Sequence, residues 1–367
     1  MAKKQKIRIL HCIYDSPGNK WINGGGAYRT VEIYKHFPEN FQITILTGNY
    51  PYANLKIKNI SFKYLGKDTN YFISRITYML YARKFLKKHH SEYDIIIEDF
   101  TPYSPLKTYK FKNSIALLQN YFGINLLKKF LFVGIIPYLY ELKMLSKYPY
   151  IIFSSEYLKN TVIKKIKKRI SNSVISYGFD PALMKVHNNE KNYILYLGRI
   201  EFYQKGLDVL IETAKELTGK NFIIAGNGKD EKKLIKKIKN IPNVNFIGRV
   251  DGKKKIKLLQ NSKFVVMPSR YESFGIVAIE AAAVGKPTIG VKNTGLQETI
   301  IPDKTGILID KLSKDLLKKA IILLWNDNKL RKRLGINARR FSSKFNWKNI
   351  AKKQMQVYKN FLKKIDK

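Results

Sequence analysis

Short apolar runs alternate with longer amphipathic stretches along nearly the whole chain. Short runs rich in β-branched and aromatic residues, bounded by glycine, proline or asparagine, are typical of buried strands, whereas longer periodic stretches are typical of helices. In the first half this pattern predicts strands at residues 7–14, 41–47, 57–65, 93–97, 114–118, 150–154 and 174–177. Helices are predicted between them, at residues 27–36, 71–90, 123–147 and 156–170. Alternating strands and helices indicate a parallel sheet covered by helices.

The same alternation begins again near residue 190. Strands are predicted at residues 193–197, 222–225, 244–247, 264–267, 288–291 and 308–310. Helices are predicted at residues 207–217, 253–261, 274–284, 313–325, 328–341 and 347–364, with a lysine-rich helix ending at Asn240. Because the segment 181–191 is polar and lacks periodicity, we place a domain boundary there and predict two α/β domains, residues 1–185 and 190–345.

One strand–helix–strand unit, residues 264–291, carries two carboxylates where a ligand can reach them. Glu272 lies in the turn before the helix, and Glu280 lies about two turns inside it. The backbone N–H groups near Ser273–Ile276 suit a phosphate, and carboxylates accept hydrogen bonds from the paired hydroxyls of a ribose or sugar. An amphipathic helix with two solvated glutamates is the alternative. The apolar residues on both sides of Glu280 favour a position in a cleft.

Four loops of the second half follow predicted strands, so we expect them to line one edge of the sheet. They contain Gly198, Gly226, Gly248 and Ser269. Arg199 and Lys205 lie on the first loop, and an arginine–lysine pair opposite a helix N-terminus suits a diphosphate. In the first half, Gly24–Gly26 precede a helix. There, a phosphate or sugar contact and a flexible surface loop are equal alternatives.

Composition narrows the class of protein without deciding its function. The chain has 367 residues, enough for two domains with their own cores, and its hydrophobic content of 45% is that of a globular protein. A single cysteine, Cys12, excludes an internal disulfide and a cysteine-rich metal site. The net charge of +42 is spread over both halves. Nucleic-acid binding, an anionic membrane surface and a bias of the whole proteome are competing causes of that charge.

No stretch indicates secretion or a membrane span. The N-terminus runs straight into a strand without the apolar segment of a signal peptide. The longest apolar run, Phe130–Tyr140, is shorter than the roughly 20 residues that a bilayer needs. We therefore expect a cytoplasmic protein, either soluble or on the inner face of the membrane. The basic, aromatic helices 71–90 and 123–147 suit a membrane surface, although such helices more often pack one face on a sheet.

Several segments resemble a known family. The segment SRYESFGIVAIEAAAVGKPTI, which contains Glu272 and Glu280, is typical of the retaining GT-B glycosyltransferases of the GT4 family and their E-x7-E motif. The segments LGRIEFYQKGLDVLIETAKEL, IIAGNGKDEKKL and NVNFIGRV match that family in its order. In the first half, GGGAYRTVEIYKHF, SSEYLKNTVIKK and VISYGFDP match more loosely. The resemblance covers most of the chain and is specific between residues 190 and 310.

The resemblance implies the GT-B fold, in which two Rossmann-like domains face each other across a cleft and close on a nucleotide sugar. It implies that Glu280 holds the ribose hydroxyls and that Glu272 contacts the donor sugar. Arg199 and Lys205 would neutralise the diphosphate as it leaves, which is where such an enzyme gains most of its rate. The last helix, residues 347–364, would cross back onto the N-terminal domain, which binds the acceptor.

Further donor contacts are implied by the same resemblance. They fall on Ser273, Phe274, Gly275, Ile276, Gly25, Gly26, Gly198, Gly226, Asn227, Arg249 and Val250. Among these, Gly25 and Gly26 would face the diphosphate, while Arg249 and Val250 would lie near the base. Gln119-Asn120 departs from the family, in which many members have a histidine near the donor sugar. The chain has no Asp-x-Asp motif, in agreement with a transfer that needs no bound metal ion and no cofactor.

We therefore predict a retaining, metal-independent transfer of a sugar from a UDP- or GDP-sugar to a lipid-linked or saccharide acceptor. Another GT-B nucleotide-sugar enzyme, such as an epimerase, is the alternative. A basic nucleic-acid-binding protein is a further alternative, but no module of that kind is recognisable and the lysines are spread over all helices. Glu272 and Glu280 are not interpreted as a glycosidase pair, because one of them is better explained as a ribose ligand.

Overall fold

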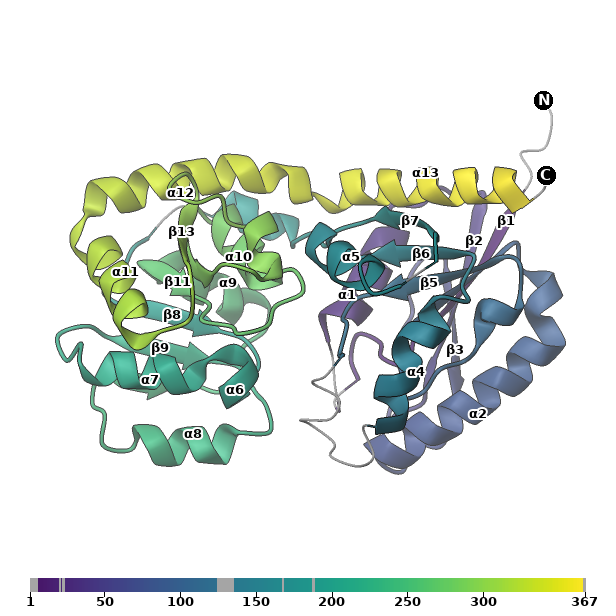
Figure 1. The fold of residues 1–367 in the computed structure, drawn as a ribbon, viewed down its shortest axis with the longest axis horizontal. Coiled ribbons are helices and arrows are strands. Elements are labelled where there is room, and N and C mark those ends of the chain that lie inside the picture. The colour runs from purple at the N-terminus through teal and green to yellow at the C-terminus, as the bar shows by residue number, and fades with distance from the viewer. Residues whose placement is uncertain are drawn as a thin grey trace. The chain divides into compact units, whose positions relative to one another are not determined.

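The computed structural model describes residues 6–19, 21, 24–123, 135–166, 168–186 and 189–365. It divides into two compact units (Figure 1). The N-terminal unit consists of residues 1–177 and 347–367, and the C-terminal unit consists of residues 178–346. Each unit is built around one parallel sheet, which confirms the predicted fold class.

Seven parallel strands form the sheet of the N-terminal unit, in the order β3-β2-β1-β4-β5-β6-β7. Their bounds are β1 Ile7–Cys12, β2 Phe41–Gly48, β3 Ile60–Leu65, β4 Ile95–Asp99, β5 Ser114–Leu118, β6 Tyr150–Phe153 and β7 Ser171–Val174. Every residue of β5 is buried, as expected of a central strand in a parallel sheet that is covered on both faces. In β1, Ile9 lies between Ile43 of β2 and Ile95 of β4, so the centre of this sheet is apolar.

Helices of the N-terminal unit begin at polar caps where the sequence supplies them. Their bounds are α1 Gly25–Tyr34, α2 Tyr71–His89, α4 Ile135–Leu145, α5 Glu156–Ile163 and α13 Trp347–Ile365, with short 3-10 turns η1 His90–Glu92 and η2 Thr108–Lys110. Asn70 accepts a hydrogen bond from the N–H of Ile73 at 3.0 Å and so caps α2. Of the predicted helix 123–147, residues 124–134 lie outside the described residues.

The last helix, α13, packs against α1 in the N-terminal unit (Figure 1). The hydroxyl groups of Tyr34 and Tyr358 lie 3.1 Å apart, and the Arg29 guanidinium donates to Gln354 Oε1 at 3.2 Å. Both contacts are buried. The end of the chain is therefore part of the core that surrounds its beginning.

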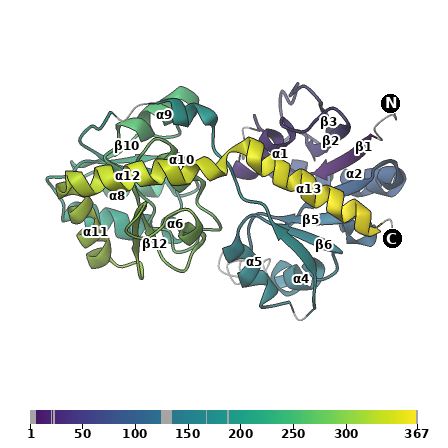
Figure 2. The same cartoon turned by 90° about the horizontal axis from the view of Figure 1, so that it is seen from above.

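Six parallel strands form the sheet of the C-terminal unit, in the order β10-β9-β8-β11-β12-β13. Their bounds are β8 Ile194–Leu197, β9 Phe222–Ala225, β10 Val244–Phe246, β11 Phe264–Val266, β12 Thr288–Val291 and β13 Gly306–Ile309. The helices are α6 Phe202–Lys205, α7 Leu207–Lys215, α8 Glu231–Ile238, α9 Gly252–Asn261, α10 Ile276–Ala283, α11 Lys314–Asn326 and α12 Asn328–Ser342. Three 3-10 turns complete the unit, η4 Pro181–Lys185, η5 Gly295–Glu298 and η6 Ser343–Phe345. Seen from above, α12 lies over α10, with which it is in contact (Figure 2).

The predicted helix 156–170 is too long, because α5 ends at Ile163. Continuing the helix would place Lys164 and Lys168 four residues apart on one face, and like charges at that spacing destabilise a helix. The apolar residue Ile166 still packs into the core beside α5, although it lies beyond the end of that helix.

The predicted strand 174–177 is also misplaced, because the strand in this region is β7, Ser171–Val174. Its sequence SNSV is polar for a strand, and its residues are only partly buried. Each of them pairs with one residue of Tyr150–Phe153 in β6. The position of β7 is therefore determined by its pairing with β6, because the sequence of β7 itself has no hydrophobic pattern.

The two units divide after Tyr177, earlier than the predicted boundary at 181–191. The intervening segment includes η4, which packs against α10 of the C-terminal unit. Arg339 of α12 also donates to the carbonyl oxygen of Val186 at 3.0 Å. These contacts explain why a polar segment without periodicity belongs to the second unit.

Candidate active site

The loops that follow β8, β9, β10 and β11 lie at the carboxyl edge of the C-terminal unit's sheet, because these strands are parallel and adjacent. Backbone hydrogen bonds join three of the loops. The N–H of Ile200 donates to the carbonyl oxygen of Asn227 at 2.9 Å, and the N–H of Gly226 donates to that of Gly248 at 2.8 Å. The predicted site residues of this unit therefore come from loops that are held to one another.

Two glycines after β9 are required by this contact between loops. Gly226 has a φ of 141°, and a Cβ atom there would lie 1.8 Å from the carbonyl oxygen of Gly198. A Cβ atom at Gly228 would lie 2.3 Å from the carbonyl oxygen of Ile200. The two glycines thus let one loop pack on the next, and Asn227 between them stays exposed.

The short helix α6 is anchored to the loop after β11. Gly206 ends α6 with a φ of 65°, and a Cβ atom there would lie 1.9 Å from the carbonyl oxygen of Pro268. The N–H of Arg270 donates to the carbonyl oxygen of Gln204 at 3.0 Å. The Arg270 guanidinium also makes two hydrogen bonds of 2.8 Å to the Asp208 carboxylate. These contacts bring the end of α6 next to the turn that carries the first of the two predicted glutamates.

Lys205 and Glu272 form a direct ion pair. Lys205 Nζ lies 2.6 Å from Glu272 Oε2, and the two side chains are 15% and 16% exposed. The Ser269 hydroxyl approaches the same carboxylate oxygen at 3.4 Å. Water is largely kept from this pair, so its electrostatic interaction is stronger than that of a surface pair. Two residues that were predicted independently for the diphosphate and the sugar are therefore neighbours.

Arg199 lies on the loop after β8 and forms an ion pair with Glu201, a residue that the sequence analysis missed. Its guanidinium is 3.7 Å from the carboxylate of Glu201, whose side chain is buried, while the Arg199 side chain is 60% exposed. Lys229 also approaches Glu201, at 3.5 Å. The buried carboxylate of Glu201 thus lies within 4 Å of two cations at the carboxyl edge of the sheet. Nothing in the sequence around Glu201 indicates this role.

The buried Tyr196 supports the loop that carries Arg199. Its hydroxyl donates to the carbonyl oxygen of Arg199 at 2.7 Å. Burial raises the pKa of Tyr196 well above its usual value, and the nearby charge of Glu272 adds to this shift. The tyrosine therefore stays protonated and keeps its hydroxyl as a donor to the loop.

The first turn of α10 has no side-chain cap. Its N-cap residue is Gly275, with a left-handed φ of 96°. The turn η5 supports this backbone, because the N–H of Gly295 donates to the carbonyl oxygen of Glu272 at 2.7 Å. A Cβ atom at Gly295 would lie 2.2 Å from the carbonyl oxygen of Ser273. Gly295 is thus a second residue of the site that the sequence analysis missed.

The residues at the start of α10 differ in what they can offer a ligand. The Phe274 side chain is buried and packs edge-on against Phe345, with ring centroids 5.7 Å apart. Only its backbone can therefore contact a ligand. Ile276, the first residue of the helix, is partly exposed. Uncapped N–H groups and the helix dipole make such a first turn suitable for an anion.

Glu280 is paired with a lysine that the sequence analysis did not single out. Lys255 Nζ, from α9, lies 2.6 Å from Glu280 Oε1. Burial by itself lowers the pKa of Lys255, but the charges of Glu280, Asp180 and Asp251 together raise it above the usual value. Lys255 is therefore charged, and the buried Glu280 in the middle of α10 has this ammonium as its direct partner.

Arg249 and Val250 follow β10 at the same edge. Arg249 Nε donates to Asp251 Oδ2 at 2.8 Å, and the Asp251 side chain is exposed. Val250 is partly exposed. Their loop also supplies Gly248, so the residues predicted for the base share a backbone contact with the loop of Asn227.

Gly25 and Gly26 lie at the start of α1 in the N-terminal unit. A Cβ atom at Gly26 would lie 2.5 Å from the side-chain amide atoms of Gln119, so this glycine lets the two segments approach. Gln119 is held from both sides. Its Oε1 accepts a hydrogen bond from the Tyr177 hydroxyl at 2.5 Å, and its Nε2 donates to the Asp99 carboxylate. The residue that departs from the family's histidine therefore sits in a fixed hydrogen-bond chain beside Gly26.

Asp99 ends β4 within this chain. Burial raises the pKa of its carboxyl group to about 7, against the hydrogen bond from Gln119 and the charge of Arg29, which lower it. Near neutral pH the group is thus divided between its two protonation states. Perturbed pKa values of this kind are common at functional sites, and Asp99 ends its strand at the carboxyl edge of a parallel sheet.

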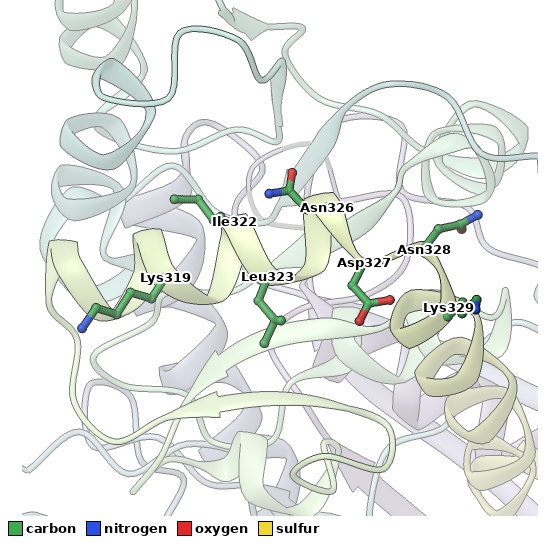
Figure 3. Close-up of a pocket in the computed structure, with 7 residues that line it drawn as sticks. All are labelled: Lys319, Ile322, Leu323, Asn326, Asp327, Asn328 and Lys329. Carbon is green, nitrogen blue, oxygen red and sulfur yellow. The ribbon is translucent and has the colours of Figure 1, made fainter.

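A large open hollow of the C-terminal unit lies away from these residues. It measures about 830 Å³ and is lined by Lys319, Ile322, Leu323, Asn326, Asp327, Asn328 and Lys329. Figure 3 shows these side chains on α11 and on the turn into α12. Asp327 caps α12 by accepting a hydrogen bond from the N–H of Leu330 at 2.8 Å. None of the predicted site residues lines this hollow.

Among the residues that the structure describes, no group of three or more His, Cys, Asp or Glu side chains is placed to hold a metal ion.

Comparison with known proteins finds a family match in the second half of the chain. Residues 183–341 match the family described as Glycosyl transferases group 1. An uncharacterized glycosyltransferase of Methanocaldococcus jannaschii is 33% identical over 210 residues, which are 57% of this chain and 58% of that protein. The chain spans about half the length of the curated relatives it matches first.

Solved structures resemble the chain along nearly its whole length. The sucrose-phosphate synthase of Thermosynechococcus elongatus is 18% identical, with a TM-score of 0.82 over 97% of this chain and 99% of that one. HepE of Anabaena, solved in complex with UDP and glucose, is 17% identical, with a TM-score of 0.73 over 96% and 99%. At these identities the likeness shows the fold. The chain has the GT-B fold, and its residues 183–341 match the family described as Glycosyl transferases group 1.

Proposed function

We propose that this protein is a retaining glycosyltransferase of the GT4 type that moves a sugar from a UDP- or GDP-sugar to a saccharide or lipid-linked acceptor, without a bound metal ion. One observation carries the proposal. Glu272 and Glu280 lie on either side of an uncapped helix start at the carboxyl edge of a parallel sheet, and each is paired with a lysine at 2.6 Å. HepE of Anabaena adds support, since it has the same fold and was solved with UDP and glucose bound.

Each part of this arrangement suits one part of a nucleotide sugar. Glu280 accepts hydrogen bonds from the ribose hydroxyls, and Glu272 accepts them from the hydroxyls of the donor sugar. The first turn of α10 receives the diphosphate. When the bond between the sugar carbon and the phosphate oxygen breaks, its electron pair goes to the diphosphate, and Lys205 and Arg199 stabilise that charge. The acceptor hydroxyl forms the new bond and passes its proton to the departing diphosphate.

The proposal is tested first by binding. A thermal-shift screen with UDP, GDP and their sugars should raise the unfolding midpoint, because a ligand that binds the folded state stabilises it by mass action. The Glu280→Ala variant should reduce that shift, whereas Glu212→Ala, an exposed glutamate of α7, should not. Equal shifts for the parent and Glu280→Ala would contradict the assigned ribose contact.

We also infer that the N-terminal unit associates with an anionic membrane surface, where a lipid-linked acceptor would be found. Exposed apolar side chains gather on α2 and α4. Phe72 of α2 is 70% exposed and Ile136 of α4 is 68% exposed, and both helices carry further exposed apolar residues. Such residues beside lysines suit the boundary between lipid head groups and acyl chains.

The charges of both helices fit a negative surface. Helix α2 contains no acidic residue and has Lys87, Lys88 and His89 in its last turn. The only acid of α4, Glu141, is buried and accepts hydrogen bonds from the N–H groups of Phe122 and Gly123. No exposed acid therefore opposes a negative surface on either helix. No helix in the described part of the chain is long and apolar enough to cross a membrane.

Side-chain contacts join the two helices within the N-terminal unit. The Arg75 guanidinium of α2 lies 5.6 Å from the centroid of the Tyr103 ring. That ring packs edge-on against Phe122, with centroids 5.0 Å apart, and the N–H of Phe122 donates to Glu141 of α4. A continuous series of contacts thus connects the start of α2 to α4.

A further inference from the structure

The lysine that pairs with Glu280, Lys255 of α9, differs from the other lysines of its helix in its exposure. Helix α9 carries four lysines, and Lys253, Lys254 and Lys257 are exposed. Lys255 alone among these points to the neighbouring helix, where its side chain is 27% exposed and that of Glu280 only 8%. Three lysines of α9 are therefore exposed to solvent, and the fourth, Lys255, forms an ion pair with Glu280 of α10.

We propose that Lys255 is a positioning and specificity residue for the nucleotide: it fixes the orientation of the Glu280 carboxylate and donates a hydrogen bond to a ribose hydroxyl oxygen. This inference rests on the proposed function, because Glu280 meets a ribose only if a nucleotide binds there. Lys255 is also tied to the loop predicted for the base, since it lies in the first turn of α9, directly after Arg249–Asp251.

The geometry leaves capacity for a diol between the two charged groups. An ammonium group has three donors and a carboxylate has about four acceptor positions, and the contact at 2.6 Å uses one of each. A ribose presents two adjacent hydroxyls. One can donate to the carboxylate of Glu280 while the oxygen of the other accepts from Lys255. A carboxylate alone could satisfy the hydroxyl protons but could not donate to their oxygens.

Carboxylates of three residues hold Lys255 in its protonated form. Asp251 lies at the N-cap of its own helix, Asp180 at the N-cap of η4, and Glu280 on α10. The negative charges of all three act on Lys255. Asp180 is held in place because its Oδ1 accepts from the N–H of Ala182 at 2.9 Å. The ammonium thus interacts electrostatically with carboxylates of three elements, and its ion pair is with Glu280.

The alternative is that Lys255 only links α9 to α10, which are in contact. A link of that kind affects the stability of the protein and does not distinguish one nucleotide from another. The proposed role predicts a dependence on the ribose hydroxyls. The two can therefore be separated by measuring how much a ligand loses when those hydroxyls are removed.

The test compares the parent with Lys255→Met, Lys255→Arg and the control Lys254→Met, an exposed lysine of the same helix. Affinities for UDP, GDP and their 2′,3′-dideoxy forms are measured by isothermal titration calorimetry. The parent should bind the better ribonucleotide about tenfold or more tightly than its dideoxy form. In Lys255→Met this ratio should fall at least about threefold, while Lys255→Arg, which keeps a donor, and Lys254→Met should keep it.

Each result has one meaning. An unchanged ratio in Lys255→Met, with or without a general loss of stability, overturns the inference and leaves the proposed function standing. A parent that binds neither UDP nor GDP overturns the proposed function and the inference with it. Should Lys255→Met fail to fold, Lys255→Ala, which also lacks a donor, takes its place: a ratio lower than that of the parent supports the inference, and an unchanged ratio overturns it.

Discussion

Lys205 Nζ lies 2.6 Å from Glu272 Oε2, although the two residues stand far apart in the sequence, one at the end of α6 and the other in the turn after β11. The contact depends on Gly206, which ends α6 against the backbone of Pro268, and on the bond between Arg270 and Gln204. The cation that we propose for the diphosphate and the carboxylate that we propose for the sugar are therefore held in place without a ligand. Such preorganisation is the main source of electrostatic catalysis in enzymes.

Replacing Lys205 by alanine should weaken the binding of UDP and GDP about tenfold or more, because one charge-assisted contact to the diphosphate is lost. Lys215→Ala is the matched control, since Lys215 is paired with Glu212 in an exposed ion pair on α7. Isothermal titration calorimetry measures both. If both variants lost the same amount of affinity for UDP and GDP, the loss in Lys205→Ala would reflect the lower net charge of the protein and not a contact with the diphosphate.

Replacing Gly226 by alanine should lower the free energy of unfolding by about 2–4 kcal/mol. A Cβ atom at this position would lie 1.8 Å from the carbonyl oxygen of Gly198, so the two loops must separate. Gly219→Ala should change the unfolding free energy little, because a Cβ atom there meets nothing within 4 Å. Urea denaturation at constant pH gives both values, and a Gly226→Ala variant as stable as the parent would show that the loops move at little cost.

Replacing Asp99 by asparagine should make the stability of the protein depend less on pH. The folded protein keeps the Asp99 proton up to about pH 7, whereas an unfolded aspartate releases it near pH 4. The stability that this group contributes is therefore fully present below about pH 4 and is lost as the pH rises toward 7. Asparagine at 99 can still accept the hydrogen bond from Gln119, and it does not ionise.

The measurement is the free energy of unfolding of the parent and Asp99→Asn at several pH values between 4 and 8. The difference should move in favour of the variant as the pH rises. Glu141, whose pKa burial also raises to about 7, acts in the same direction, so the Asp99→Asn variant should keep part of the pH dependence. Parallel curves for the two proteins would refute the assignment of a raised pKa to Asp99.

Serine at Phe72, Ile76 and Leu80 together should reduce co-sedimentation with anionic vesicles several-fold at low salt. These side chains of α2 are exposed, so their replacement removes apolar contacts with lipid and little packing within the protein. Ile235→Ser, on an exposed position of α8 in the C-terminal unit, is the control. Binding of the parent should fall as salt is added, because salt screens the attraction of basic residues to the surface. A parent that stays in the supernatant would rule out the inferred membrane surface.

Much of the fold could be predicted because a parallel sheet that is covered on both faces needs apolar residues at nearly every strand position. Strands such as β9, Phe222–Ala225, and β5, Ser114–Leu118, have the predicted bounds. The prediction failed where contacts with neighbouring elements, and not the hydrophobicity of the segment, determine its structure. The polar β7 is a strand because β6 offers it hydrogen bonds, and η4 belongs to the second unit because Arg339 and α10 hold that region.

The sequence by itself determined the alternation of strands and helices, the two parallel sheets, and the motif that contains Glu272 and Glu280. These depend on local spacing and on burial, which a linear pattern records. The tertiary structure alone decided which cations serve which carboxylates, as in the pairs Lys205–Glu272 and Lys255–Glu280. In a chain with 69 lysines and arginines, no pattern of charge marks those few. Only packing of α6 and α9 against the loop and helix after β11 brings them within hydrogen-bond distance of a buried carboxylate, where their charge is stabilised.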